Sequence, residues 1–295
     1  MSGNPDGANR WESLYATPAG IGLLMDNAFK QPVVLTIAGF DPSGGAGVLA
    51  DIKTIAAFEC YGVAAVTSLT FQNTRQVRGA LNQTAEAVRE QIAPLFEDFE
   101  IAAIKTGMLP TAEIIQAVAG IIRANAVPVV VVDPVLKSTS GVDLVDDVAI
   151  DALTNDLIPI ASLVTPNIAE AQRISGVDIK DQLQMERAAE VILKFGSRAV
   201  LVTGGDASSG SSTDFLLDAQ GSAVFSTERI RSKHTHGTGC TLASALACLL
   251  ARGSSLRESV PIAKQYVMQA ILSAPGLGLG NGPLNHFPPG FDLNH

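Results

Sequence analysis

The segment from Lys233 to Thr241 combines a glycine-rich turn with a cysteine. Within it, residues 235–240 read Thr-His-Gly-Thr-Gly-Cys, and an apolar helix is predicted to begin near Leu242. A glycine-rich turn at a helix N-terminus offers unpaired backbone N–H groups and the positive end of the helix dipole, and both attract anions. The segment, called the anion loop below, is therefore predicted to form an anion hole. The alternative is an ordinary loop in which Thr238 caps the helix.

Cys240 stands in the first turn of that helix. There the helix dipole lowers the pKa of a thiol and favours a thiolate that can serve as base or nucleophile. The alternative is a small buried residue, which is the commoner fate of a free cysteine. Cys60 and Cys248 stand among apolar neighbours and are predicted to be core residues. Because the three cysteines form no Cys-x-x-Cys pair, neither a disulfide framework nor a zinc site is indicated, and a reducing cytoplasm fits best.

Asn167, Glu170 and Asp133 are the candidate metal ligands. The segment Asn-Ile-Ala-Glu begins a predicted helix directly after a strand, so its amide and carboxylate share one helix face. Mg²⁺ bound to substrate phosphates keeps water ligands and takes only one or two carboxylates, so these three residues can organise a hydrated ion. The alternative is helix capping, with Asn167 at the N-cap and Glu170 at N3. His234 and His236 lack the partners of a metal site, and His236 is assigned to the anion loop.

Other ligand classes are excluded by motif and composition. A P-loop requires a lysine after its second glycine, but the segment that starts at Gly39 continues Gly44-Gly-Ala. The late glycine series from Gly276 to Gly282 follows no predicted strand and is interpreted as a loop, not a dinucleotide turn. The net charge is −9 with scattered basic residues, which excludes a generic nucleic-acid partner. No apolar stretch reaches the roughly 18 residues of a membrane span.

An alternation of apolar runs and amphipathic stretches predicts an α/β fold with a mostly parallel sheet covered by helices. Buried strands are predicted at Val33–Ala38, Val63–Leu69, Ile101–Lys105, Val129–Asp133, Ile160–Thr165 and Ala199–Thr203, each followed by a crossover helix. Helices are predicted at Gly47–Phe58, Thr84–Phe96, Thr111–Arg123, Asp147–Asp156, Ile168–Ile174, Gln182–Phe195, Thr238–Arg252 and Leu256–Ser273. Polar clusters follow these strands, which predicts a site at the carboxyl edge of the sheet, where ligands bind in such folds.

The pattern changes after the last of these strands. Two short β-like pieces, Asp214–Leu217 and Ala223–Ser226, flank a turn and predict an antiparallel hairpin at one edge of the sheet. No linker divides residues 33–287, so one domain is predicted there. Residues 1–32 are expected to form a loosely ordered N-terminal extension, and residues 288–295 a C-terminal tail.

A set of motifs, taken in chain order, carries a family resemblance. The motifs are Thr36-Ile-Ala-Gly39-Phe-Asp41-Pro-Ser-Gly-Gly-Ala-Gly47, Ala50-Asp51-Ile-Lys53-Thr54, Gln72-Asn-Thr74, Lys105-Thr-Gly-Met108-Leu, Val132-Asp133-Pro-Val135, Thr165-Pro-Asn167-Ile-Ala-Glu170-Ala, Thr235-His-Gly-Thr-Gly-Cys240-Thr-Leu and Gly282-Pro-Leu-Asn-His286-Phe. From about Val33 to Phe287, the chain resembles the hydroxymethylpyrimidine/phosphomethylpyrimidine kinases of thiamine biosynthesis, within the ribokinase-like superfamily. The resemblance implies a three-layer α/β/α sandwich, ATP and Mg²⁺ as cofactors, and a homodimer.

The resemblance also implies roles for individual residues. The pyrimidine is expected among Gly39, Asp51, Gln72, Met108 and Val135, with the Gln72 amide on the ring. Cys240 is expected to help activate the hydroxymethyl group, while the backbone at Gly237 and Gly239 stabilises the transferring phosphoryl group. The residues expected on the nucleotide side are Thr203, Gly205, His236, Thr238 and Lys105. Asn167 and Glu170, with Asp133, are expected to organise Mg²⁺.

Two departures from the family pattern concern the phosphate contacts. Some relatives have lysine where this chain has Thr203, and some have lysine at the place of Thr139, whereas here Lys137 stands two positions earlier. These changes leave the family resemblance intact.

The resemblance implies ATP-dependent phosphorylation of 4-amino-5-hydroxymethyl-2-methylpyrimidine to its monophosphate and then to its diphosphate. The nearest alternative is a pyridoxal kinase, because pyridoxal is also a six-membered heteroaromatic ring with a hydroxymethyl group; Gln72 and Met108 favour the pyrimidine. A binding protein without transfer chemistry is disfavoured because Cys240, Asn167 and Glu170 occur together. A cysteine hydrolase is disfavoured because no histidine and carboxylate are placed to complete a triad with Cys240.

Overall fold

The computed structural model describes residues 31–137, 144–205 and 210–293, so Thr139 and nearly all of the predicted N-terminal extension lie outside the described residues. The strands are β1 (Val33–Phe40), β2 (Tyr61–Gln72), β3 (Val77–Asn82), β4 (Ile101–Thr106), β5 (Val129–Val132), β6 (Leu163–Val164), β7 (Val200–Gly205), β8 (Ser211–Asp218) and β9 (Gly221–Glu228). The α-helices are α1 (Gly47–Ala57), α2 (Ala85–Asp98), α3 (Ala112–Asn125), α4 (Asp147–Ala152), α5 (Ile168–Ser175), α6 (Gln182–Lys194), α7 (Thr238–Ala251) and α8 (Leu256–Leu272). None of the helices in the described part of the chain combines the length and apolar character needed to cross a bilayer.

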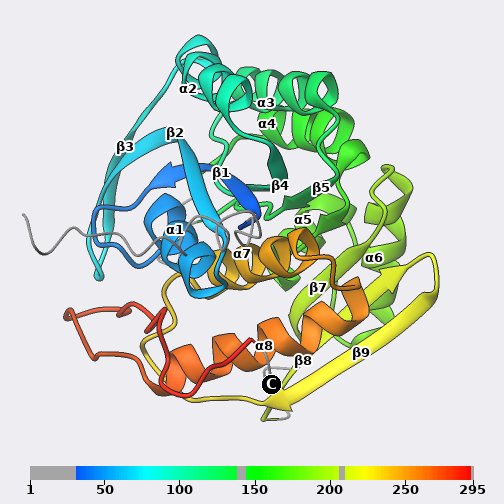
Figure 1. Cartoon of the computed structure of the whole chain (residues 1–295). Coiled ribbons are helices and arrows are strands. Elements are labelled where there is room, and N and C mark those ends of the chain that lie inside the picture. Colours follow the sequence, from blue (N-terminus) through cyan, green and yellow to red (C-terminus); the bar gives the residue numbers. More distant parts are fainter. Residues whose placement is uncertain (1–30, 138–143, 206–209, 294–295) are drawn as a thin grey trace, which may run out of the picture. The chain divides into compact units, whose positions relative to one another are not determined.

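The strands form one sheet in the order β3-β2-β1-β4-β5-β6-β7-β8-β9. Neighbours from β2 through β7 pair in parallel, whereas β3 at one edge and the β8–β9 hairpin at the other pair antiparallel (Figure 1). The predicted mostly parallel sheet and edge hairpin are therefore confirmed. The strand order reverses between β1 and β4, because β2 lies on one side of β1 and β4 on the other. Ligands bind at such a switch point, outside the carboxyl ends of the strands.

Three local predictions are wrong. β2 continues to Gln72 and leads into β3, not directly into a crossover helix. The sequence pattern misses β3 because its residues are largely exposed and carry no apolar run. The strand predicted at Ile160–Thr165 is reduced to Leu163–Val164, because Ile158–Ile160 forms a 3₁₀ turn with proline at its start.

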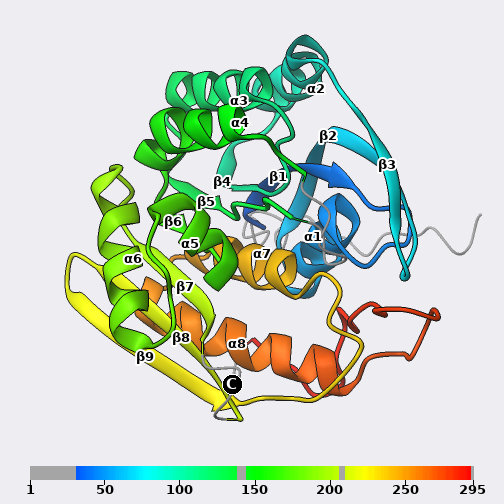
Figure 2. The same cartoon turned by 180° about the vertical axis from the view of Figure 1, so that it is seen from behind.

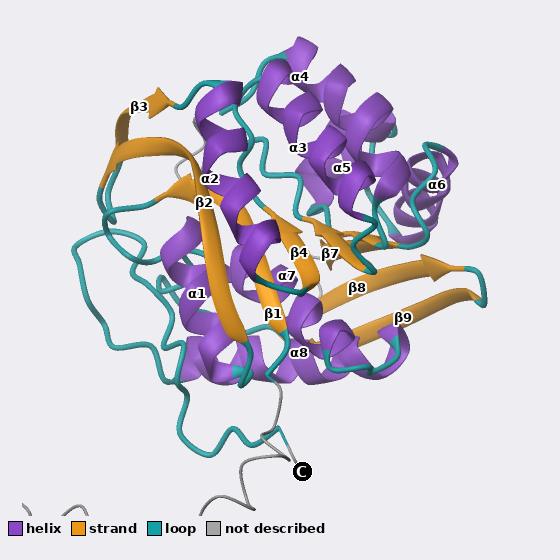
Figure 3. Cartoon of the chain, turned by 45° about the horizontal axis from the view of Figure 1, so that its top comes forward, coloured by secondary structure: helices purple, strands orange, loops and turns teal. Residues whose placement is uncertain are grey.

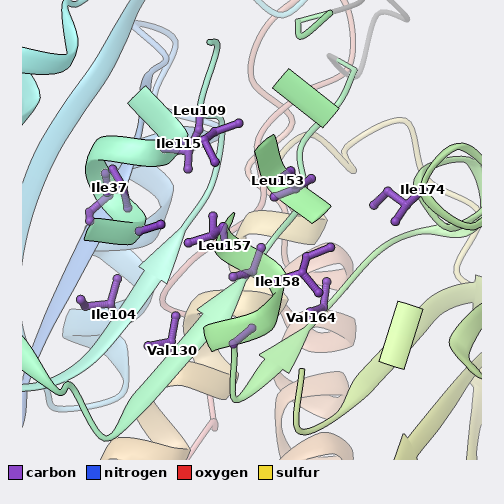
Figure 4. Close-up of a cluster of buried hydrophobic side chains, with 14 of the residues drawn as sticks. Ile37, Ile104, Leu109, Ile115, Val130, Leu153, Leu157, Ile158, Val164 and Ile174 are labelled. Atoms are coloured by element: carbon purple, nitrogen blue, oxygen red, sulfur yellow. The ribbon is translucent and has the colours of Figure 1, made fainter. Parts of the chain in front are cut away.

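Helices cover both faces of the sheet and give three layers, with α1, α7 and α8 on one face and α2 to α6 on the other (Figures 2 and 3). The buried strands serve both layers because successive side chains point to opposite faces. In β5, Val131 packs in the cluster beneath α7, whereas Val130 and Val132 pack in the cluster beneath α3 and α4. Figure 4 shows part of that second cluster, which also contains Leu157 and Ile158. Because apolar side chains are buried on both faces of the sheet, the sheet is the middle layer of the fold.

α7 is the central helix of its layer. Its residues from Thr241 to Leu249 are all buried, and it contacts α1, α8, β4 and β5. A helix that is apolar on all sides is buried on all sides, as observed. Its N-cap is Gly237, with φ of 86°, and no side chain caps the first turn. The N-terminus of α7 is therefore open to bind a negatively charged group.

Candidate active site

A cavity of about 470 Å³ opens at the carboxyl ends of β1 and β4. It is lined by most of the predicted site residues: Gly39, Gln72, Met108, Asp133, Val135, Asn167, Glu170, Thr203, His236, Gly237, Thr238, Gly239 and Cys240. Lys137, one of the departures from the family pattern, lines it as well. Three predicted site residues do not line the cavity. Asp51 and Lys105 are fully buried, and Gly205 is the last residue of β7. The topology thus gathers into one site polar residues that are far apart in the sequence.

The anion loop contacts a second glycine-rich turn, which contains Gly45. A Cβ atom on Gly237 would collide with the carbonyl oxygen of Gly45, so only glycine permits this approach. Thr238 donates its hydroxyl to the carbonyl of Thr235 at 2.7 Å. The alternative in which Thr238 caps the helix is therefore wrong, because its side chain is turned to another partner and the N-cap is Gly237. The N–H groups of Thr238 and Thr241 donate to the carbonyls of Thr235 and Gly237, which leaves those of Gly239 and Cys240 for a ligand.

A contact between the side chains of Asp41 and His236 also joins these two turns, and both residues line the cavity. His236 Nε2 lies 2.8 Å from Asp41 Oδ2. Asp41 also accepts hydrogen bonds from the N–H and hydroxyl of Ser43, at 2.8 and 2.7 Å, and from the N–H of Ala46 at 2.9 Å. Burial acts to raise the pKa of Asp41, but the hydrogen bonds from His236 and Ser43 outweigh it and the pKa is lowered. Asp41 was missed as a site residue, although its place directly after β1 was a usable signal.

Lys105 and Asp51 form a buried ion pair behind the cavity. Lys105 Nζ lies 2.9 and 3.0 Å from the two carboxylate oxygens of Asp51, and 3.6 Å from Asp133 Oδ2. The hydroxyls of Thr36 and Ser244 donate to Asp51 at 2.6 and 2.8 Å. Burial disfavours the cation, but the carboxylate of Asp51 prevails and the pKa of Lys105 is raised. These donors occupy both oxygens of the Asp51 carboxylate. Asp51 therefore holds neighbouring side chains in place and does not line the cavity.

Cys240 lies at the cavity in the first turn of α7, partly exposed. Burial raises the pKa of its thiol to about 12; Lys105 acts in the opposite direction, but Asp133 and Asp51 add to the effect of burial. The expectation that the helix dipole lowers this pKa is therefore wrong. Loss of hydration and two neighbouring carboxylates outweigh the dipole, so Cys240 is a neutral thiol at pH 7 in the ligand-free protein.

Asn167 and Glu170 form the capping box of α5 and also line the cavity. The N–H of Asn167 donates to Glu170 Oε2 at 2.9 Å, and the N–H of Glu170 donates to Asn167 Oδ1 at 3.0 Å. The capping alternative is thus confirmed, and the Glu170 carboxylate has a further hydrogen bond with the backbone of Leu136. Burial and the negative charge of Asp133 raise the pKa of Glu170 to about 8.

Apolar side chains line the cavity next to the polar residues Thr70 and Gln72 of β2. Met108, Val135 and Val77 line it together with the amide of Gln72. A Cβ on Gly39 would come within 3.1 Å of Met108 Sδ, so glycine leaves room for the thioether. An apolar wall with a single amide suits a flat heteroaromatic ring. Val77 was missed because it belongs to β3.

Thr203 lines the opposite part of the cavity, next to the capping box. Its N–H donates to the carbonyl of Pro166 at 2.9 Å, and an isolated parallel bridge pairs it with Asn167. The ends of β6 and β7 are therefore joined at the site.

The chain is similar to known proteins over most of its length. The family model for phosphomethylpyrimidine kinase matches residues 41–285. The hydroxymethylpyrimidine/phosphomethylpyrimidine kinase of Streptomyces coelicolor is 42% identical over 255 residues, which cover 86% of this chain and 94% of that protein. The thiamine biosynthesis bifunctional protein ThiED of Geobacter sulfurreducens is 45% identical over 258 residues, which cover 88% of this chain but 53% of that protein. The chain thus spans about half the length of the bifunctional relative.

Solved structures give the same result for the fold. The pyridoxal kinase of Staphylococcus aureus in complex with AMP-PCP and pyridoxal has a TM-score of 0.80 and 32% sequence identity, and the match covers 88% of this chain and 94% of that one. The ribokinase-like fold expected from the motifs is therefore confirmed. On the family match, the identity to its relatives and this fold, the chain belongs to the phosphomethylpyrimidine kinase family, a family of phosphotransferases.

Proposed function

We propose that the chain transfers the terminal phosphoryl group of ATP to the hydroxymethyl group of 4-amino-5-hydroxymethyl-2-methylpyrimidine, and then to the monophosphate so formed, in thiamine biosynthesis. The observation that carries the proposal is one cavity with two kinds of wall. Gln72 and Met108 belong to an apolar wall with one amide, and Gly239 and Cys240 belong to an anion loop. The first suits an aminopyrimidine and the second a transferring phosphoryl group. The names of the relatives support this substrate.

The anion loop acts on the charge of the transferring group. Phosphoryl transfer passes through a loose transition state with charge on the equatorial oxygens, so fixed donors are the main contribution that a protein makes. The N–H groups of Gly239 and Cys240 supply such donors at the positive end of α7. Asp41 and His236 keep the loop in place, so no reorganisation is needed when the charge develops.

Cys240 orients the hydroxymethyl oxygen. With its pKa raised to about 12, the thiol keeps its proton at pH 7 and acts by hydrogen bonding, not by removing a proton before transfer. A loose transition state needs little prior deprotonation of the acceptor hydroxyl. Positioning of that oxygen against the phosphoryl group is then the contribution of Cys240 to the rate.

Asp133 and Glu170, with Asn167 beside them, fit Mg²⁺ that enters with ATP. Among the described residues, Asp133 Oδ2 is one of the buried oxygens without a hydrogen bond, and its charged neighbour is Lys105 Nζ at 3.6 Å. The pKa of Glu170 is raised to about 8 by burial and by Asp133, a repulsion that a cation relieves. Within the same residues no three His, Cys, Asp or Glu side chains gather into a metal cluster, which agrees with an ion that shares its ligands with water and phosphate. When bound, the ion neutralises phosphate charge.

The nucleotide is assigned to the part of the cavity near Thr203, Gly205 and Thr238, next to the residues that fit the metal. Support comes from the Staphylococcus aureus pyridoxal kinase, solved with AMP-PCP and pyridoxal, which shares the fold. Lys105 stays behind the wall and acts through Asp51 and Asp133.

A cytoplasmic homodimer completes the proposal. Leu69 and Phe71 of β2 and Leu81 of β3 are exposed, and Leu69 pairs with Leu81 across the strands. Such an apolar strip supports an interface with a second copy of the chain. Light scattering coupled to gel filtration of the full chain tests it, with twice the chain mass expected and the single mass contradicting it.

To test the activity, the purified full chain is incubated with ATP and Mg²⁺ and with either the hydroxymethylpyrimidine or its monophosphate. The products are identified by mass spectrometry. Appearance of the monophosphate and then the diphosphate supports the proposal. Pyrimidine binding without any phosphorylated product would contradict it. The pyridoxal kinase alternative has one observation in its favour, the likeness to the pyridoxal kinase fold. Pyridoxal is therefore offered in a parallel reaction.

A further inference from the structure

A buried ion pair lies outside the cavity and joins α8 to the edge hairpin. Lys264 of α8 contacts Asp214 Oδ2 of β8, and their side chains are only 7% and 4% exposed. Lys264 Nζ also donates to the carbonyl of Ser212 at 3.3 Å. Isolated ion pairs at such depth are often replaceable by apolar residues without loss of stability, so stability alone does not account for this one.

The second oxygen of Asp214 points to a different partner. Asp214 Oδ1 accepts the N–H of Gly204 at 2.8 Å. Gly204 lies between Thr203 and Gly205 at the end of β7, with φ of 81°. Arg229 donates from Nη2 to the carbonyl of Gly204 at 3.3 Å. The side chain of Asp214 in β8 and that of Arg229, which follows β9, therefore hold both backbone groups of this glycine.

The sheet itself cannot hold Gly204 in place. The β7–β8 register shifts between Val202, which pairs with Phe215, and Gly205, which pairs with Thr213. Gly204 falls inside this irregularity, where the ladder of backbone hydrogen bonds is interrupted. Asp214 stands at the same point of β8 and supplies the missing acceptor. The neighbouring Thr203 lines the cavity.

We propose that Asp214 and Lys264 are positioning residues for the nucleotide: Asp214 fixes the backbone of Gly204, so that Thr203 and the end of β7 present a preformed surface to ATP, and Lys264 holds the carboxylate in that orientation. The inference rests on the proposed function, because it takes the end of β7 as the nucleotide side. Burial raises the pKa of Asp214, whereas Lys264 and the N–H of Gly204 act in the opposite direction because both favour the charged carboxylate. A charged acceptor makes the stronger hydrogen bond to a backbone N–H.

Two double variants separate positioning from simple stabilisation. Asp214→Leu with Lys264→Met removes the ion pair and the acceptor for Gly204, whereas Asp214→Asn with Lys264→Met removes the ion pair but keeps an oxygen acceptor. Because neither variant leaves a buried charge unpaired, both are expected to fold and to melt in one transition. Nucleotide binding is measured by titration calorimetry with ADP, and KM is measured for ATP and for the pyrimidine.

The expected result is a loss of about tenfold in ADP affinity and a rise of the same size in the KM for ATP in the Leu/Met variant. The KM for the pyrimidine stays unchanged, and the Asn/Met variant recovers most of the nucleotide affinity. Equal behaviour of the two variants, in either direction, would overturn the inference. If the unaltered chain binds no ADP, the nucleotide assignment of the proposed function fails as well, so the two failures are distinguishable.

Discussion

Lys105 and Asp51 stand 54 positions apart in the sequence and form a fully buried ion pair, with Lys105 Nζ 2.9 Å from Asp51 Oδ1. Both were expected to touch a ligand, and the structure places them behind the ligand cavity instead. Their pair sets the electrostatic environment of Asp133 and Cys240, since Lys105 opposes the rise in the pKa of both groups. A charged pair outside the cavity lining therefore acts on two residues of the lining.

Removing one partner of this pair leaves a buried charge. Asp51→Asn is expected to lower the free energy of unfolding by about 3 kcal/mol, because Lys105 then lacks its main counter-charge. Lys105→Met combined with Asp51→Asn is expected to lose less than the sum of the single changes. Urea unfolding of the four proteins measures this coupling. Strict additivity would show that the two side chains do not interact.

Cys240→Ala is expected to lower kcat on the order of 100-fold while the KM for the pyrimidine changes little, because the thiol positions the reacting oxygen. Cys240→Ser keeps a hydrogen-bonding group and is expected to retain more activity than the alanine variant. The matched control is Cys248→Ala, a buried cysteine of the same helix. Normal turnover in Cys240→Ala would assign the residue to packing.

Gly237→Ala is expected to abolish the anion loop, because the added Cβ collides with the carbonyl oxygen of Gly45 and the backbone has φ of 86°. The loss of kcat is expected to be at least about 100-fold. Gly253→Ala is the control, since Gly253 has φ of 91° and a Cβ added there would meet nothing within 4 Å. It should cost about 1 kcal/mol of stability and leave kcat intact. Equal activities of the two variants would contradict the role of the Gly45–Gly237 contact.

Gln72→Ala is expected to raise the KM for the pyrimidine about tenfold and to leave the KM for ATP unchanged, because Gln72 lines the cavity together with Met108. Gln76→Ala serves as control, since Gln76 is an exposed glutamine of the neighbouring turn that does not line this cavity. Steady-state kinetics with each substrate varied in turn measure both KM values. An unchanged pyrimidine KM would remove Gln72 from the ring site.

His286 makes stability depend on pH. Burial, with a smaller effect of Lys53, lowers the pKa of His286 from 6.5 to about 4, so between these values the unfolded chain binds a proton that the folded chain does not. Stability is therefore present above pH 6.5 and lost as the pH falls toward 4, by about 3 kcal/mol from this group. The difference in unfolding free energy between the parent and His286→Gln is expected to shrink across that window. A difference that stays constant from pH 7 to pH 4.5 would contradict the assignment.

Much of the fold follows from local patterns in the sequence. β1, β4, β5 and β7 are buried on both faces, so they stand out as apolar runs, and the polar residues that follow them meet at one edge. β3 is different because it is an exposed edge strand, held by pairing with β2 and not by an apolar face of its own. No local pattern distinguishes such a strand from a loop.

The electrostatics of the site could not be predicted in the same way. Asp41 and His236 stand 195 positions apart, so their contact depends on the packing of the whole domain. The pKa of Cys240 depends on burial and on carboxylates from other elements, and these outweigh the helix dipole that the sequence reveals. Residue types at the site were therefore predictable, whereas their protonation states required the three-dimensional structure.

We expect the cavity to select a hydroxymethylpyrimidine for phosphoryl transfer. This selectivity is tested most directly by a competition in one reaction, with equal concentrations of the pyrimidine and pyridoxal, limiting ATP, Mg²⁺ and the full chain, and with products counted by mass spectrometry. Phosphorylated pyrimidine is expected to exceed pyridoxal phosphate by at least about tenfold. Pyridoxal phosphate as the main product would contradict it.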